Sequence, residues 1–168
     1  MTELIEKTTI ACPLAQAAMQ VNRFFADHTG GDGNAHVPLR LPLHLPGRNA
    51  PLVLEQVVVA TVVPDREPGQ LTPRYRLTWT PAERSESYPA FEGELRVESE
   101  DYDSFVLGIH GHYTPPMGIA GAAFDFAVGR FIAAATARDL LHRIRADVEG
   151  AFQAAEARKR ERTASSSS

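Results

Sequence analysis

The amino-acid sequence predicts an α+β domain in which a curved antiparallel sheet wraps around a long C-terminal helix. Several segments alternate strictly between apolar and polar residues, as strands with one buried face do. A short amphipathic helix is expected near the N-terminus. A helical run from about 121 to 152 is too apolar to lie on the surface of a domain, so it needs a large concave partner.

The first expected elements are an edge strand and a short helix. Residues 3–11 are rich in Thr and Ile, which favour a strand. Pro13 suits the first position of a helix, where its missing N–H costs nothing. Apolar residues then recur at helical spacing, and Gly30 and Gly31 end the element. We therefore expect a helix over about 13–27.

The next two strands differ in pattern. Between Val37 and Leu45, leucines alternate with polar residues or proline, which indicates a half-buried strand. Pro38 and Pro42 lack backbone donors, so this segment is restricted to an edge strand or an irregular ribbon. Residues 52–63 form a nearly continuous apolar run, which we expect in a central strand covered on both faces.

Three further strands, at 74–80, 91–98 and 105–113, show the clearest alternation. The polar phase of the first carries arginines and that of the second carries glutamates. We therefore expect arginines opposite glutamates on the wet face of the sheet. Pro115 and Pro116 end the last strand because neither can donate a backbone hydrogen bond.

The C-terminal helix has two apolar stripes. At about 100° per residue, one stripe runs along the whole helix and a second lies opposite it in the first half only. The first half is therefore expected to be covered on two sides, and the second half to have one wet face. The first stripe contains Phe126, Ala133, Ala137, Leu140, Leu141, Ile144, Val148 and Phe152, and the second contains Phe124, Val128, Phe131, Ile132 and Ala135.

Composition limits the classes of protein to consider. The chain has 168 residues and 43% hydrophobic content, which fits one domain over 1–156 and a charged, Ser-rich disordered tail over 157–168. A net charge of -4 without a dominant basic stripe argues against a nucleic-acid partner. A single cysteine, Cys12, fits the cytoplasm, and no segment is long enough for stable membrane insertion.

The order of these elements resembles the helix-grip fold of the START-like, or SRPBCC, superfamily, which includes Bet v 1-like and polyketide cyclase-like proteins. The resemblance is carried by the segment GHYTPPMGIAG at 111–121, which leads into the long helix, and by IACP at 10–13. It covers about residues 3–155, but the segment 37–51 is less regular than the second strand of the family, which leaves the strand count open there.

The resemblance implies a deep cavity between sheet and C-terminal helix that holds apolar molecules. Aromatic side chains on the apolar phase of the sheet would line this cavity, and the hydroxyl and indole groups among them need polar partners. Small helix residues would leave room opposite them. The candidate ligand-binding residues are Tyr75, Trp79, Phe91, Tyr113, Phe126, Arg130, Ala133 and Ala137.

Arg130 stands out because its angle falls within the first apolar stripe of the helix. A buried guanidinium requires a carboxylate, a carbonyl or an anionic ligand group. Three outcomes are open: orientation of a polar ligand head, an internal pair with Asp125 or a sheet residue, or extension of the long side chain into solvent.

No metal, cofactor or catalytic residue is expected from the sequence. His110 and His112 have the spacing that places two imidazoles on one face of a strand, as a metal site would need. The alternation of the strand places both on the wet face with the glutamates, and spacing identifies no third ligand. No nucleophile, phosphate-binding or nucleotide-binding motif is found.

Three functions remain open. The first is binding of a small apolar or amphipathic molecule, such as a lipid or polyketide, between the sheet and the long helix. The second is an aromatase/cyclase in which Tyr75, Tyr113 and Arg130 position a polyketide-like substrate. The third is a protein-interaction module in which the second apolar stripe, with Phe131, packs against another chain, including a second copy in a homo-oligomer.

Overall fold

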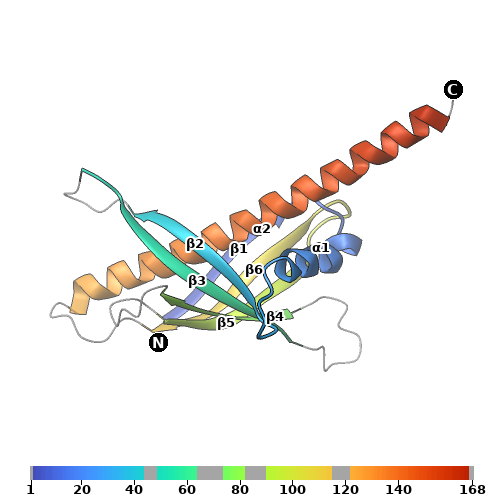
Figure 1. The fold of residues 1–168 in the computed structure, drawn as a ribbon. Helices are drawn as coiled ribbons and strands as arrows, with labels where there is room; N and C mark the ends of the chain where they lie inside the picture. The colour runs from blue at the N-terminus through green and yellow to red at the C-terminus, as the bar shows by residue number, and fades with distance from the viewer. Residues whose placement is uncertain (1, 44–48, 64–73, 82–89, 115–121, 167–168) are drawn as a thin grey trace.

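The computed structural model describes residues 2–43, 49–63, 74–81, 90–114 and 122–166 (Figure 1). Strands and helices follow the order that the sequence predicts. They are β1 (Thr2–Ile10), α1 (Leu14–Ala26), β2 (Ala35–Leu43), β3 (Leu52–Val63), β4 (Arg74–Pro81), β5 (Ala90–Ser99), β6 (Phe105–Thr114) and α2 (Ala122–Ser166).

The six strands form one antiparallel sheet in the order β1-β6-β5-β4-β3-β2. Successive strands from β2 to β6 pair as a meander, and β6 then pairs with β1, so β1 and β2 form the two edges. The sheet curls, and α2 crosses it (Figure 1). A curved antiparallel sheet around a long C-terminal helix is the helix-grip fold, which confirms the predicted fold class.

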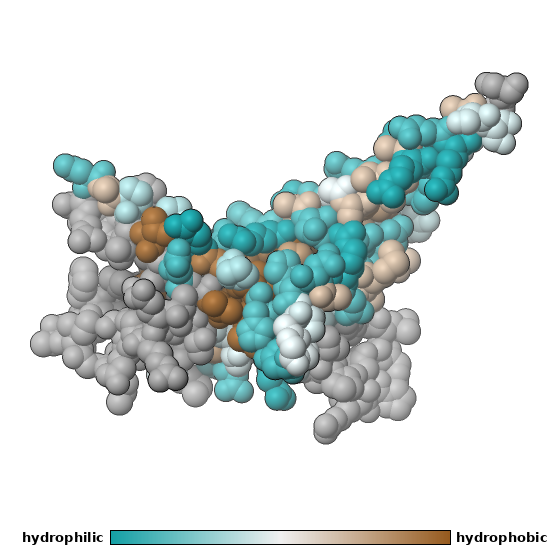
Figure 2. Space-filling view, in the orientation of Figure 1, coloured by the Kyte–Doolittle hydropathy of each residue, from teal (hydrophilic) through white to brown (hydrophobic). Residues whose placement is uncertain are grey.

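The position of β2 at an edge confirms the prediction from its prolines. The expectation that β3 is covered on both faces is wrong. Val58 is fully buried, but Val53, on the outer face, is 50% exposed, and Val57 and Val59 are only half-buried. On the face shown in Figure 2, hydrophobic side chains gather over β2 and β3. Because β-branched residues favour a strand on either face of a sheet, the apolar run indicated a strand but not which of its side chains are buried.

Charges on the outer face only partly follow the predicted pairing. Arg76 stands opposite Glu94 across β4 and β5, as expected. Arg74 instead stands opposite Arg96. Arg96 Nη2 lies 2.8 Å from Glu94 Oε2, two residues back along its own strand. Such exposed pairs contribute at most about 1 kcal/mol to folding.

A glycine pair lets β5 and β6 approach closely. Gly93 and Gly111 stand opposite each other. A Cβ atom on Gly111 would lie 2.5 Å from the Glu92 carbonyl oxygen and 2.6 Å from the Gly93 Cα. The same atom would lie 2.6 Å from Phe91 Cζ, so the Phe91 ring covers the space that side chains would otherwise occupy. Only glycine fits at this crossing.

Helix α2 is longer than the sequence predicts. The apolar stripe predicts an end near residue 152, and a disordered tail was expected over 157–168, but the helix continues to Ser166. The added residues are mostly Ala, Glu, Lys and Arg, which have high helix propensity. Lys159 Nζ lies 2.6 Å from Glu156 Oε1, one turn back. This part of the helix runs beyond the sheet (Figure 1).

Candidate functional site

Four aromatic side chains, Tyr75, Trp79, Phe91 and Tyr113, lie on the inner face of the sheet, and we call them the aromatic face. All four are buried, as the alternation of their strands predicts. Trp79 stands opposite Phe91, and Phe91 stands opposite Tyr113, so these three form a row across β4, β5 and β6. The Trp79 and Phe91 rings are stacked, with centroids 3.8 Å apart and an interplanar angle of 7°.

Helix α2 is tied to both edges of the sheet. On the β1 side, Arg138 Nη2 donates a hydrogen bond of 3.0 Å to Glu6 Oε1. On the β2 side, Arg143 Nη1 donates one of 3.1 Å to the Pro38 carbonyl oxygen. Helix α2 contacts β1 more extensively than it contacts β2, α1 and β6. Strands β4 and β5 lie between these two edges.

The second half of α2 packs tightly at the end of the domain that holds α1. The predicted stripe is confirmed there, since Leu140, Leu141, Ile144 and Val148 are all buried. Glu149 Oε1 accepts a hydrogen bond of 2.9 Å from the backbone N–H of Ala11, in the turn between β1 and α1. The helix is therefore fixed in position relative to the sheet.

Small residues of α2 occupy the stripe nearer its N-terminus. Ala133 and Ala137 are fully buried and belong to the same core as the aromatic face. Both are candidate residues that the sequence singled out, and the structure brings them into the same interior. The side chain of Phe126, also a candidate, lies outside the described residues.

Arg130 is exposed, which is the third of the outcomes that its sequence position left open. Its long side chain reaches solvent, whereas the preceding residue, Gly129, is buried. In the second apolar stripe, Phe131 is 48% exposed and Ile132 is buried. The side chains of the other two large members, Phe124 and Val128, lie outside the described residues.

Tyr75 is anchored to the first helix. Its hydroxyl donates a hydrogen bond to Asn22 Oδ1 of α1. Its ring lies beside that of Phe25, with centroids 4.7 Å apart. Burial raises the pKa of the Tyr75 hydroxyl well above its ordinary value, so the group stays protonated. The polar atom of this tyrosine is already used within the protein.

Two polar atoms of the aromatic face, Trp79 Nε1 and Tyr113 Oη, are buried, and neither has a hydrogen-bond partner within the described part of the chain. Each such atom typically costs about 1–3 kcal/mol, because it has lost water and gained nothing. Buried groups of this kind call for an explanation. The sequence identified both residues, but no pattern in it distinguishes them from Tyr75.

The two histidines lie on the outer face, as the alternation of β6 predicts. His110 Nε2 lies 3.4 Å from Glu98 Oε1, and Lys7 Nζ lies 2.7 Å from Glu98 Oε2. The hydrogen bond from Lys7 is the main cause that lowers the pKa of Glu98. His112 is exposed. The described residues contain no group of three or more His, Cys, Asp or Glu side chains that could hold a metal ion.

Cys12 is fully buried next to the start of α1, where it packs as a small core residue. Burial is the main cause that raises the pKa of its thiol, and the charge of Glu149 adds to the effect. A raised pKa leaves little thiolate at neutral pH, so this cysteine is not activated as a nucleophile.

A surface pocket of about 490 Å³ lies between the start of α1 and the turn from β5 to β6. Tyr102, in its wall, is 95% exposed. Ser99, which also lines the pocket, and Phe91 lie at opposite ends of β5, so the pocket is separate from the row of Trp79, Phe91 and Tyr113.

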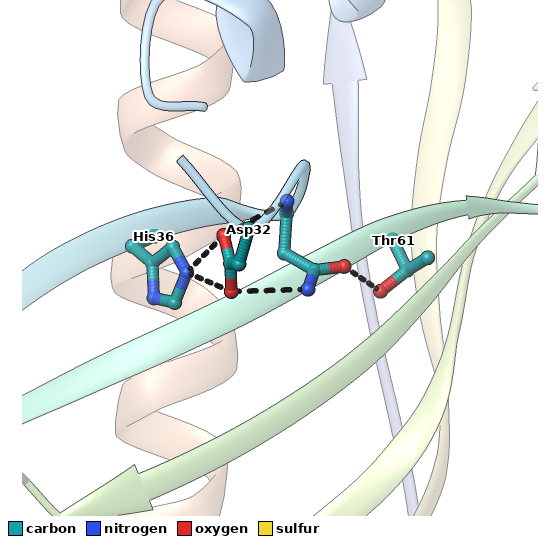
Figure 3. A network of polar contacts seen from close by, with 4 residues as sticks. Asp32, His36 and Thr61 are labelled. Carbon is teal, nitrogen blue, oxygen red and sulfur yellow. Dashed lines mark hydrogen bonds and ion pairs between the residues drawn. The ribbon is translucent and has the colours of Figure 1, made fainter. Parts of the chain in front are cut away.

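A polar network closes the loop between α1 and β2 (Figure 3). Asp32 accepts hydrogen bonds of 3.1 Å from both the backbone and the side-chain nitrogen of Asn34, and its Oδ2 lies 2.9 Å from His36 Nε2. Thr61 Oγ1 of β3 donates a hydrogen bond of 2.7 Å to Asn34 Oδ1. The hydrogen bonds from Asn34 are the main cause that lowers the pKa of Asp32 to about 2.

Asn34→Ala is expected to raise the pKa of Asp32 toward its ordinary value of about 3.9. Because the native pKa is lowered, the network stabilises the fold above the ordinary pKa, and this contribution is lost as the pH falls toward about 2. Carboxyl carbon NMR titration measures the shift, with Asn49→Ala in an exposed loop as the control. An Asp32 that titrates near its ordinary value in the unaltered protein would contradict the network.

Comparisons with known proteins concern the fold. No protein-family model and no curated protein matches the chain. One similar solved structure is a START superfamily protein from Mycobacterium smegmatis, with 13% identity, a TM-score of 0.41 and coverage of 84% of this chain and 96% of that chain. Another is the Zhui aromatase/cyclase from Streptomyces sp. R1128, with 16% identity, a TM-score of 0.45 and coverage of 90% and 93%.

The order of the elements and of the strands decides the fold. The chain has a helix-grip fold. Within the described part of the chain, no helix has a stretch long and apolar enough to cross a membrane.

Proposed function

We propose that the protein binds a small apolar or amphipathic molecule between the inner face of the sheet and α2. One observation carries the proposal: α2 is tied to both edge strands, β1 and β2, while the aromatic face lies on β4, β5 and β6, which are between them. Ala133 and Ala137 belong to the same interior and offer little side-chain volume. Pockets for small molecules are lined mainly by apolar and aromatic side chains.

The polarity of this interior supports an apolar ligand. Apart from the tyrosines and the tryptophan of the aromatic face, Gln20 and Thr136 are the only polar residues among the described buried ones, and none of the described buried residues is charged. A ligand that buries about 300 Å² of apolar surface there would gain about 7 kcal/mol before the cost of association. A micromolar affinity corresponds to about 8 kcal/mol after the cost of association, so it needs a larger buried area or additional hydrogen bonds.

The aromatase/cyclase hypothesis requires Tyr75, Tyr113 and Arg130 to act together on one substrate. The hydroxyl of Tyr75 is bonded to Asn22, and Arg130 is exposed. These positions favour binding over catalysis by those three groups.

Ala137→Leu tests the proposal because it adds bulk to the proposed binding space. We expect the variant to keep its stability and to bind the neutral dye Nile red at least about tenfold more weakly, since about 1.4 kcal/mol of lost contact gives that factor. Fluorescence titration measures the affinity, and urea unfolding measures the stability. Ala146→Leu, at an exposed position of the same helix, is the matched control.

Two results would contradict the proposal. Failure of the unaltered protein to bind Nile red or any lipid-like molecule, including in native mass spectrometry of protein purified from cells, would remove it. A loss of about 1–3 kcal/mol in the free energy of unfolding of Ala137→Leu, with dye binding unchanged, would show a core already filled at this position.

A further inference from the structure

We propose that the ligand presents a neutral hydrogen-bond acceptor, such as a ketone, ester or ether oxygen, to Trp79 Nε1 and Tyr113 Oη. This inference rests on the proposed function and specifies the chemistry of the bound molecule. It depends on the two buried polar atoms of the aromatic face that have no partner within the described part of the chain.

The two atoms belong to one small region of the sheet. Trp79 on β4 and Tyr113 on β6 stand on either side of Phe91 on β5, so their Cα atoms are about 10 Å apart. Trp79 is 1% exposed and Tyr113 is fully buried. The Trp79 ring is held in place by its stack on Phe91, so its N–H keeps a fixed position. Neither atom can turn to bulk water without a rearrangement of the core.

The donor and acceptor properties of these groups identify the complementary chemistry. An indole N–H can only donate a hydrogen bond, and a tyrosine hydroxyl can donate as well as accept. An acceptor oxygen is therefore the group that satisfies both. A ligand that carries only donors would leave Trp79 Nε1 unpaired.

The charges around the site favour a neutral acceptor over a carboxylate. A buried carboxylate needs a cation or several donors to replace its water. No described buried residue is a cation. Arg130 is exposed, and Arg138 is paired with Glu6. A carbonyl or ether oxygen requires no such partner.

Tyr75 provides the internal comparison. It lies on the same face of the sheet and is as deeply buried as Tyr113, but its hydroxyl is bonded to Asn22. The aromatic face therefore contains one tyrosine hydroxyl with a partner and one without. Tyr75→Phe and Tyr113→Phe remove the same atom from these two environments and form a matched pair.

Three probes of equal chain length test the chemistry: 2-nonanone, nonane and nonanoate. Competition with Nile red gives the affinities, and 2-nonanone is expected to bind about tenfold more tightly than nonane and more tightly than nonanoate at pH 8. Trp79 is the only tryptophan, so its side-chain N–H gives a single indole cross-peak in a ¹⁵N-labelled sample. We expect 2-nonanone, and not nonane, to move this peak downfield.

Substitutions then test whether the Tyr113 hydroxyl and the Trp79 N–H cause the preference for the ketone. Tyr113→Phe and Trp79→Phe are expected to reduce the affinity for 2-nonanone about tenfold and to leave that for nonane unchanged. Tyr75→Phe is expected to keep the preference for the ketone. Without ligand, Tyr113→Phe should unfold at the same or a higher urea concentration than the unaltered protein, because the hydroxyl that it loses has no partner among the described residues.

The failure of this inference can be told apart from the failure of the proposed function. The inference of a neutral acceptor is overturned if 2-nonanone and nonane bind equally and the indole peak does not move, or if nonanoate binds more tightly. Either result would leave the proposed ligand binding in place. If none of the three probes binds and Nile red does not bind, the proposed function fails and this inference fails with it.

Discussion

Gly111→Ala is expected to lower the free energy of unfolding by about 2–3 kcal/mol, which is the range of an overpacked core. The added methyl group would lie 2.5 Å from the Glu92 carbonyl oxygen and 2.6 Å from the Gly93 Cα. Both are backbone atoms of the neighbouring strand, so the clash cannot be relieved by a change of rotamer. Strands β5 and β6 must move apart, and the Phe91 ring must leave its place over the glycines.

Urea unfolding followed by the fluorescence of Trp79 measures this loss. Gly150→Ala is the matched control, because a Cβ atom there meets nothing within 4 Å. This residue lies inside α2, where alanine is favoured over glycine by up to about 1 kcal/mol, so the control should be stabilised. A Gly111→Ala protein that unfolds at the same urea concentration as the unaltered one would show that the two strands do not approach as described.

Leu140→Ala is expected to lower the free energy of unfolding by about 3 kcal/mol, which is within the range for replacing a core leucine by alanine. Leu140 is fully buried in the part of α2 that is tied to the edges of the sheet. The neighbouring ties through Arg138 and Arg143 limit how far the helix can shift to close the cavity. The free energy of unfolding in urea gives the value.

The control for Leu140→Ala is Met19→Ala on α1. Met19 is 61% exposed, so its truncation should change stability by no more than about 0.5 kcal/mol. A loss of less than about 1 kcal/mol in Leu140→Ala would mean that α2 is free to move onto the sheet. The helix would then not be held at a fixed distance from the aromatic face.

Much of the fold could be predicted because strands and helices with one buried face carry a periodic signal. The alternation at 74–80, 91–98 and 105–113 identified β4, β5 and β6 and the face that each buries. The prolines of β2 identified an edge. Periodicity did not predict which face of β3 is buried, because valine occupies both faces of this strand. It also failed after residue 152, where a helix continues without an apolar stripe.

Contacts between distant residues could not be predicted from local patterns. The pair of Glu6 and Arg138 joins positions 132 residues apart, and the bond from Tyr75 to Asn22 joins positions 53 apart. Nothing in the spacing of either residue indicates its partner. The division into one domain over 1–156 rests on composition and stays a prediction.

The sequence predicted which residues belong to the candidate site better than it predicted what their polar groups do. The alternation of strands brought the four aromatic residues together, and the helical stripe added Ala133 and Ala137. The angle of Arg130 could not show that its side chain reaches solvent, because a long side chain can leave an apolar face. Phe126 stays a prediction. Which tyrosine hydroxyl is already bonded became visible only in three dimensions.

The prolines of β2 also bear on how the molecule behaves at high concentration. A foreign strand that tried to extend the sheet along this border would find no amide hydrogen at Pro38 or Pro42. At the opposite border, Glu6 of β1 forms an ion pair with Arg138 of α2, and this helix contacts β1 more extensively than any other strand. Both borders are thereby poor templates for strand addition, which opposes polymerisation into fibrils.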